Sequence, residues 1–329
     1  MNVVEERISD QQGCYDERFP LVLVNPPGEG DGAQLRGWLR EKETWLRERL
    51  GHHGAILFRG FPCQSDSDFD GFVEALGCPN FRYRDSLSNA VRVNRTERVF
   101  TANEAPPEVT IFLHHEMAQT PIYPSSLFFF CEQAAEAGGA TPLCRSDVLL
   151  DRMRREIPGF VSDCESKGLR YTNTMPGEND PESGMGRSWQ STLSCETRAQ
   201  AEERLRQLGY QWTWEENHCL RVTTPRLPAI RELASGRQAF FNQLIAASKG
   251  WKDNRNDPSK AVTHGDGSLL DHDAVRHAAA IADELSFDLC WQTGDVAWVD
   301  NFTTMHGRRT FSGTRKVLAS LVASETEQR

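Results

Sequence analysis

Hydrophobic residues in the first quarter of the chain recur with the spacing of helices. Between Ala33 and Gly51, apolar residues fall three and four positions apart, which predicts one apolar helix face. The short apolar run Gly54–Phe58 predicts a buried strand, and Asp66–Leu76 again has helical spacing, with Gly77 as its expected end. This part of the chain is therefore expected to form a helix, a strand and a second helix.

From Val109 onward the pattern favours strands. Val109–Met117 is rich in β-formers, and Leu127–Cys131 is apolar on both faces, as in a buried strand. Further helices are expected over 146–158, Thr197–Leu208 and Asp273–Leu285, and further strands over Phe287–Gln292, Val296–Asn301 and Lys316–Val322. The stretch between about 165 and 275 is polar and rich in turns, which predicts an insertion that builds walls and a lid.

This order of elements predicts an α+β, mainly β chain. Strands occur early and late with helices before and between them, which suits an antiparallel barrel or jelly roll with flanking helices. We expect one domain over residues 1–329, with the jelly-roll core at roughly 109–146 and 285–323. A doubly wound sheet would need regular strand–helix alternation, which the pattern lacks.

Charge and composition exclude several classes of protein. The net charge of −10 argues against a nucleic-acid surface and against an anionic membrane surface. The longest apolar runs are far shorter than the roughly 20 residues of a membrane helix. The polar, acidic start does not resemble a signal peptide, so a cytoplasmic location is expected. The nine cysteines contain no C-x-x-C pair, which favours reduced thiols over a structural zinc site.

The residues with the clearest chemical meaning are His114 and Glu116. On a strand, side chains two positions apart share a face, so these two would project together, with His115 on the opposite side. One imidazole and one carboxylate supply two ligands of the facial triad that binds non-haem iron. His306, just after a predicted strand, is the best candidate for the third ligand.

Two further residues suggest a site for a dicarboxylic cosubstrate. Thr141 closes a Gly-Gly-Ala-Thr segment 25 residues after Glu116, and Arg315 follows His306 by nine positions. A guanidinium binds a carboxylate through two parallel hydrogen bonds, and a hydroxyl can share that role. Thr141 and Arg315 are therefore expected to hold the distal carboxylate of such a molecule.

These residues together resemble the iron(II)/2-oxoglutarate oxygenases of the taurine dioxygenase and clavaminate synthase group. Within that group the chain resembles the syringomycin-type amino-acid β-hydroxylases. The matching segments are 54–61, 114–117, 138–142, 186–190, 240–243, 265–267, 300–301, 306–308 and 311–315. The resemblance implies a double-stranded β-helix, iron(II) on His114, Glu116 and His306, 2-oxoglutarate on Thr141 and Arg315, and O2 as second cosubstrate. Halogenating members lack the carboxylate ligand, so Glu116 argues against halogenation.

Three positions depart from the pattern of the group. Ala140 stands where relatives usually carry Glu, and Arg315 follows His306 at a shorter distance than in taurine dioxygenase. Arg308 or Arg309 could therefore be the clamp instead. Some relatives have a second arginine at the position of Ala319, so the substrate site is expected to have one cation fewer.

Four residues are candidates for contact with substrate. Trp189 could line the pocket or fill the core, and Asn242 could bind substrate or fix its own loop. Arg170 and Arg187 are candidate anchors for a substrate carboxylate.

The predicted function is oxidation, most simply hydroxylation, of a C–H bond in an amino-acid-like small molecule. The substrate would be free or bound to a carrier protein, in specialised metabolite biosynthesis such as that of antibiotics. The same metal centre could instead catalyse desaturation, epoxidation or cyclisation. A zinc hydrolase and a non-catalytic jelly-roll binding protein are remoter alternatives, and a homo-oligomer is compatible with the sequence.

Overall fold

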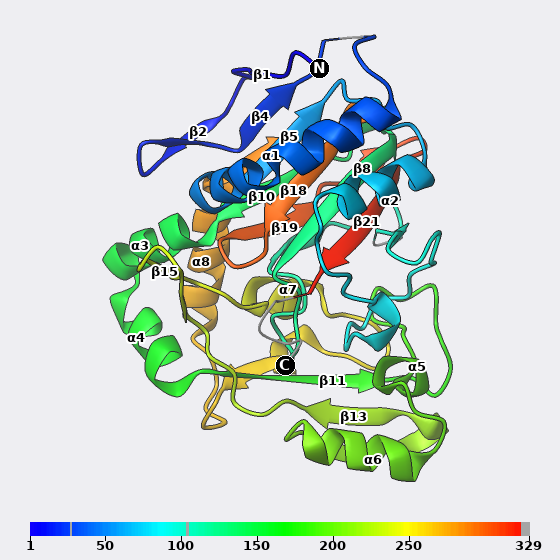
Figure 1. Ribbon diagram of the computed structural model, residues 1–329. Helices are drawn as coiled ribbons and strands as arrows, with labels where there is room; N and C mark the ends of the chain where they lie inside the picture. The colour runs from blue at the N-terminus through cyan, green and yellow to red at the C-terminus, as the bar shows by residue number, and fades with distance from the viewer. Residues whose placement is uncertain (27, 103–104, 324–329) are drawn as a thin grey trace.

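Two β-sheets lie against each other in this protein, and helices cover the outer face of each sheet (Figure 1). The computed structural model describes residues 1–26, 28–102 and 105–323. Within these ranges the chain is a mixed α/β protein with four layers, in the order helices, sheet, sheet, helices. This arrangement agrees with the predicted combination of strands and flanking helices.

The larger sheet has seven strands and is built from both ends of the chain. In spatial order they are β1 (Val4–Glu5), β4 (Leu21–Val24), β5 (Ala55–Arg59), β18 (Val296–Asp300), β8 (Ser126–Gln133), β21 (Lys316–Val322) and β6 (Phe100–Thr101). Helices α1 (Gly32–His53) and α2 (Asp66–Ala75) pack on its outer face. The Asp31 carboxylate accepts from the backbone of Ala33 and Gln34, which fixes the start of α1.

The smaller sheet has four strands in the order β17 (Ser286–Leu289), β10 (Thr141–Arg145), β19 (Thr304–Arg308) and β7 (Ile111–His114). Its outer face packs on α3 (Ser146–Glu156), α4 (Pro158–Lys167), α7 (Leu244–Gly250) and α8 (His272–Glu284). Because side chains alternate along a strand, Leu113 and Met305 point to these helices while His114 and His306 point between the sheets.

The space between the sheets is filled by apolar side chains. Phe129 and Ala319 come from the larger sheet, and Leu143 and Phe287 come from the smaller one. The Phe129 ring lies 5.3 Å from the imidazole of His306, centroid to centroid. The apolar filling therefore ends at the side chains expected to bind metal.

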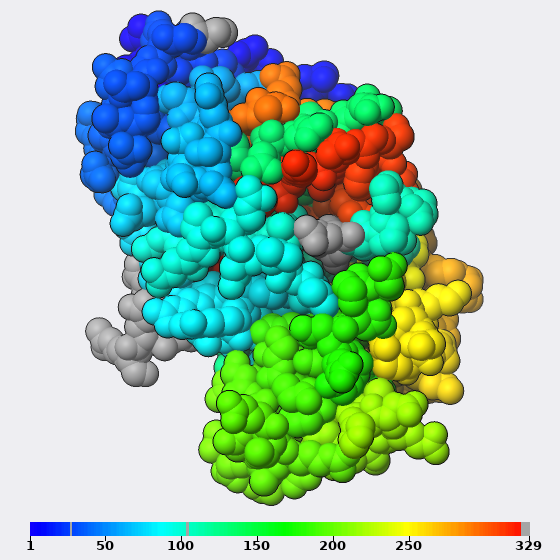
Figure 2. Space-filling model, turned by 90° about the vertical axis from the view of Figure 1, so that its right-hand side faces the viewer, coloured from blue at the N-terminus to red at the C-terminus, as the bar shows by residue number. Residues whose placement is uncertain are grey.

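The region expected to be an insertion contains a third sheet with helices of its own. The sheet has the order β12 (Gln211–Trp214), β13 (Leu220–Thr223), β11 (Leu169–Met175) and β16 (Val262–His264), and α5 (Trp189–Leu193) and α6 (Arg198–Gln207) lie beside it. Figure 2 shows part of this region as the green lower lobe. The small two-stranded sheets pair β2 (Gln12–Cys14) with β3 (Glu17–Phe19), β9 (Ala137–Gly138) with β20 (Phe311–Ser312), and β14 (Arg231–Glu232) with β15 (Gln238–Ala239).

Most expected elements are confirmed to within a few residues, but the strand expected over Val109–Met117 is too long. Strand β7 ends at His114, and the chain then turns, with Met117 at a φ of 57°. His306 lies inside strand β19 rather than after a strand. No helix in the described part of the chain is long and apolar enough to cross a membrane.

Candidate metal centre and adjoining cavities

The two candidate histidines lie opposite each other on neighbouring strands. His306 of β19 pairs directly with His114 of β7, and their ring centroids are 4.4 Å apart. The register shifts just after this pair, at Gly307. A Cβ atom at Gly307 would lie 2.5 Å from the carbonyl oxygen of Ile111, closer than real contacts allow. Glycine is therefore required for the strands to approach at the metal centre.

Glu116 is held by a turn rather than by the strand. The side chain of Asn301, fully buried at the end of β18, accepts from the Glu116 backbone nitrogen at 2.7 Å. Its amide group donates to the carbonyl oxygens of Glu116 at 3.0 Å and of Pro124 at 2.8 Å. Side-chain alternation along a strand therefore does not place Glu116, because β7 ends at His114 and Asn301 fixes the turn that places Glu116 beside His114.

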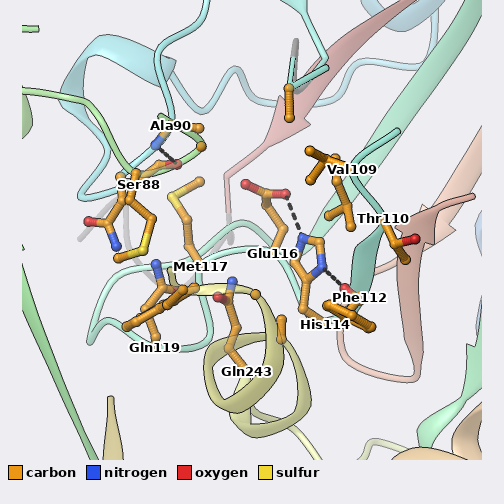
Figure 3. Close-up of a pocket in the computed structure, with 18 of the residues that line it drawn as sticks. Ser88, Ala90, Val109, Thr110, Phe112, His114, Glu116, Met117, Gln119 and Gln243 are labelled. Carbon is orange, nitrogen blue, oxygen red and sulfur yellow. Dashed lines mark hydrogen bonds and ion pairs between the residues drawn. The ribbon is translucent and has the colours of Figure 1, made fainter. Parts of the chain in front are cut away.

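The three side chains converge on one point. A ligand atom from each of His114, Glu116 and His306 lies within 4.8 Å of the other two. One carboxylate oxygen of Glu116 lies 3.4 Å from Nε2 of His306 and 3.9 Å from Nε2 of His114. Figure 3 shows the side chains of Glu116 and His114 pointing toward each other at the wall of a cavity. Two imidazoles and one carboxylate are the donor set of a mononuclear non-haem iron site.

The protonation of His114 suits a metal ligand. Its Nδ1 lies 2.8 Å from the carbonyl oxygen of Phe112, which can only accept, so Nδ1 carries the proton and Nε2 offers its lone pair. Burial, together with the nearby imidazole of His306, lowers the pKa of His114 to about 4. The ring is therefore neutral at neutral pH, as metal binding requires.

Arg92 is a charged residue at the centre that the sequence gave no reason to single out. Its guanidinium Nη2 lies 3.2 Å from Glu116, and both side chains are more than nine-tenths buried. Burial raises the pKa of Glu116, but the charge of Arg92 and the hydrogen bond from His306 outweigh burial and hold that pKa well below its usual value. Glu116 is therefore ionised, as a metal ligand must be.

His115 lies behind the metal centre. It is fully buried, its ring packs 4.8 Å from that of Phe241, and Nδ1 donates to the carbonyl oxygen of Asn301 at 2.5 Å. This agrees with the expectation that His115 points to the side opposite His114 and Glu116.

Two cavities meet at the centre. The larger cavity has a volume of about 130 Å³ and the smaller one of about 50 Å³. Arg92, Ile111, His114 and Glu116 line both, and we call these four residues the shared wall. A metal ion bound to the three ligands would therefore face both cavities.

The smaller cavity contains both residues expected to hold 2-oxoglutarate. Arg315 donates to the carbonyl oxygen of Gly139 at 2.9 Å, and its other end lies 3.4 Å from the hydroxyl of Thr141. Trp291 also donates to this hydroxyl, at 2.9 Å. Burial and the nearby charge of Arg308 lower the pKa of Arg315 to about 10, and no carboxylate of the described residues pairs with it. In the smaller cavity, Arg315 therefore offers a positive charge that has no carboxylate partner among the described residues.

The two alternative clamps are placed differently. Arg308 lines the smaller cavity, but its guanidinium donates to the carbonyl oxygens of Ala105, Pro106 and Val109, each at 2.7 Å. Arg309 forms ion pairs with Asp283 and Asp288. Of the three arginines, Arg315 is the one that faces Thr141 across the cavity.

The larger cavity is lined by residues from the loop before β7, from the turn after it and from the insertion. Its labelled residues in Figure 3 include Ser88, Phe112, Met117, Gln119 and Gln243. The side-chain oxygen of Gln119 is buried without a hydrogen-bond partner among the described residues. The cavity is thus mixed in polarity and open to a small polar molecule.

None of the four candidate substrate residues is among the described residues that line the two cavities. Trp189 donates to the carbonyl oxygen of His218 and packs against Trp214. Asn242 bonds to its own loop through Ala229 and Leu244, so the loop-fixing interpretation describes its contacts. The neighbouring Gln243, which does line the larger cavity, donates to the carbonyl oxygen of His115.

The two candidate arginine anchors also lie elsewhere. Arg170 sits on β11, opposite Thr263 of β16. Arg187 is buried and donates to the carbonyl oxygens of Arg84, Ser86, Ser88 and Ser191. Arg187 therefore organises the 84–90 segment, part of which lines the larger cavity, without reaching the cavity itself.

Comparison with known proteins shows the family to which the chain belongs. The model of the taurine catabolism dioxygenase TauD, TfdA family matches residues 17–321, so the chain belongs to this family. It is an iron(II)- and 2-oxoglutarate-dependent dioxygenase, with a His-Glu-His site that fits the metal.

Individual relatives are similar over almost the whole chain. A clavaminate synthase-like protein of Arabidopsis thaliana is 39% identical over 325 residues, covering 97% of this chain and 98% of the relative. The dapdiamide synthesis protein DdaC of Enterobacter agglomerans is 30% identical, covering 84% of each. An asparagine oxygenase solved with Fe(II), 3-hydroxyasparagine and succinate shares the fold, with a TM-score of 0.53, 14% identity and coverage of 89% of this chain and 81% of that one.

Proposed function

We propose that this enzyme hydroxylates a C–H bond of an amino-acid-like small molecule, free or carried by a partner protein, in specialised metabolite biosynthesis. The observation that carries the proposal is the shared wall, where His114 and Glu116 line both cavities, while His306, the third expected metal ligand, lines the smaller one. In one cavity Arg315 has no carboxylate partner among the described residues, and the other cavity has mixed polarity. A dicarboxylate in the first and an organic substrate in the second would both lie next to the metal.

The proposed fold of the core is a double-stranded β-helix. Along the chain, β6, β7, β8 and β10 alternate between the two sheets, β17 follows in the same sheet as β10, and β18, β19 and β21 alternate again, an order that suits an eight-stranded jelly roll. We propose a single domain over 1–329, with the insertion at 165–275 as a wall of the larger cavity. Gly184, Met185 and Gln243 line that cavity from the insertion.

We propose that His114, Glu116 and His306 bind iron(II), and that Arg315 and Thr141 hold the distal carboxylate of 2-oxoglutarate. The bound metal with O2 supplies the oxidising power for removal of a hydrogen atom from carbon. One O2 and one 2-oxoglutarate are consumed; one oxygen atom enters the new alcohol, and the other enters succinate as CO2 leaves. The protein positions both molecules and excludes water from the shared wall.

The relatives support the choice of substrate class. One similar chain bears the name of a dapdiamide synthesis protein, and one structure of the same fold holds a hydroxylated asparagine. Ser88, Gln119 and Gln243 give the larger cavity neutral hydrogen-bonding groups, which suit an amino acid. Arg187 and Asn242 would affect that substrate through the segments that they hold, and Trp189 and Arg170, which lie outside the described lining of both cavities, have no direct contact with it in this proposal.

The alternatives predict different products. Desaturation or cyclisation would give a product two hydrogen atoms lighter than the substrate, with water released, whereas hydroxylation adds one oxygen atom. Epoxidation of a carbon–carbon double bond also adds one oxygen atom, but it gives a product without a new hydroxyl group. A zinc hydrolase would work without O2 and release no succinate. A binding protein would keep its ligand affinity after substitution of His114 or His306.

The test is an anaerobic titration of the protein with Fe(II) and 2-oxoglutarate, followed by exposure to air with candidate amino acids. We expect the weak visible absorption band of the chelate, and succinate release that a suitable substrate stimulates. His306→Ala should abolish both signals. Stoichiometric iron binding without any chelate band in the intact protein would refute the proposal.

A further inference from the structure

The larger cavity has a single cationic residue in its described lining. Of the residues that line it, Arg92 is the one arginine or lysine, and Glu116 is the one carboxylate. The side chain of Arg92 is 8% exposed. A charge buried to this degree needs an anionic partner, because burial without one costs several kcal/mol.

Arg92 is rigidly placed. Its guanidinium lies 4.9 Å from the ring of Tyr83 and 5.4 Å from that of Phe100, and the hydroxyl of Tyr83 is itself fixed by the carbonyl of Ala90 at 2.6 Å. One nitrogen contacts Glu116, while Nε is buried without a partner among the described residues. The fork is therefore preorganised and only partly used.

The balance of charge changes once the site is loaded. Glu116 alone balances Arg92 in the absence of metal, but a divalent metal adds two positive charges to the same wall. Glu116 and the keto-acid end of 2-oxoglutarate contribute one negative charge each, so the wall with Arg92 keeps a formal charge of about +1. A substrate carboxylate would neutralise it.

We propose that Arg92 binds the carboxylate of the substrate, so that the enzyme acts on a free carboxylic acid and not on a carrier-bound thioester. This inference rests on the proposed function and narrows it. Because the same guanidinium contacts a metal ligand, the bound carboxylate lies next to the metal. The carbon that is oxidised is therefore close to this carboxylate, at the α- or β-position. The side-chain oxygen of Gln119 in the same cavity, which has no hydrogen-bond partner in the part of the chain that the structure describes, suits the substrate ammonium group.

The test compares ligands that differ only in this charge. Protein loaded anaerobically with Fe(II) and 2-oxoglutarate is titrated with each common L-amino acid, with its carboxamide and with its N-acetylcysteamine thioester, and the shift of the chelate band gives the affinity. We expect one or more free acids to bind at least about 30-fold more tightly than the matching amide, the size expected for loss of a buried charge pair.

Two variants assign this preference to Arg92. Arg92→Met should reduce the acid-to-amide ratio to near one, and Arg92→Lys should retain part of it. Since Arg92 also contacts Glu116, the ratio and not the absolute affinity is the readout. Arg82→Met, at a residue that is ion-paired to Glu97 on the surface, is the matched control and should keep the ratio of the intact protein.

Three outcomes would overturn the inference: no free acid in the panel binds, thioesters bind better than acids, or Arg92→Met keeps the preference for acids. Failure of the proposed function is separately visible, because the intact protein would then show no chelate band before any amino acid is added.

Discussion

Replacing Asn301 with Ala should disturb the metal centre by releasing the turn that positions Glu116. Asn301 is fully buried and its side chain contacts none of the metal-binding side-chain atoms, but it makes three hydrogen bonds that fix the turn carrying Glu116. The substitution removes all three and leaves the backbone of Glu116 and Pro124 without these partners. Glu116 would then be free to leave its position beside His114.

The structure gives the size of the effect. Each hydrogen bond contributes about 1 kcal/mol net, and a buried group left unpaired costs about 1 to 3 kcal/mol. We expect a loss of about 3 to 5 kcal/mol in the free energy of unfolding, which most domains survive. Because supporting residues tune metal sites, affinity for iron(II) should also fall by roughly 10- to 100-fold.

Urea denaturation of the metal-free protein measures the first effect, and anaerobic titration with Fe(II) measures the second. Asn254→Ala, at an exposed position, is the control and should change stability by less than about 0.5 kcal/mol. If Asn301→Ala binds iron as tightly as the intact protein, Glu116 is positioned by something other than this side chain, and the reasoning is wrong.

Three further predictions follow from the described contacts. Arg315→Met should weaken binding of 2-oxoglutarate by about 30-fold or more, measured by titration of the iron-loaded protein, while Arg309→Met should leave it near that of the intact protein. Glu116→Gln should lower iron affinity and also destabilise the metal-free protein, because Arg92 loses its ion-pair partner; both are measured as for Asn301. Burial raises the pKa of Asp253, but hydrogen bonds from Arg255, Ser183 and Asn256 outweigh burial and hold that pKa below the usual value. Asp253→Asn should therefore destabilise the protein at neutral pH, and its stability should fall less steeply below about pH 4 than that of the intact protein.

Each of these has a result that would contradict it. Equal effects of Arg315→Met and Arg309→Met would point to general damage and not to a carboxylate clamp. A metal-free Glu116→Gln protein as stable as the intact one would show that Arg92 does not depend on this carboxylate. The folded state keeps Asp253 ionised, so its contribution to the free energy of unfolding is present above the pKa of the unfolded state and is lost as the pH falls. If the stability of Asp253→Asn falls as steeply at acidic pH as that of the intact protein, the assignment is contradicted.

The helices and long strands could be predicted because their patterns are local. The apolar face of α1 and the two-sided apolar run of β8 each follow from the burial of one element. The His and Glu residues of the metal centre could be named from residue type and spacing. Their geometry could not, since Glu116 depends on Asn301, 185 positions away.

The residues around the substrate cavity were harder to predict for the same reason. Trp189 and Arg187 look functional in a linear motif, yet their contacts are with Trp214, His218 and the 84–90 segment. Arg92 stands in a stretch without periodicity, so no sequence signal distinguishes it. Only the packing of Tyr83 and Phe100 around its guanidinium brings it to the metal ligands.

Among the described residues, the two cavities share four lining residues, and this separation matters for how such an enzyme can diversify. Substitutions at Ser88, Met185 or Gln243 alter one compartment while leaving the Arg315 compartment untouched. Selection could thus retune which molecule is accepted without rebuilding the machinery that consumes oxygen. The same partition offers protein engineers a place to randomise residues at low risk to the reaction itself.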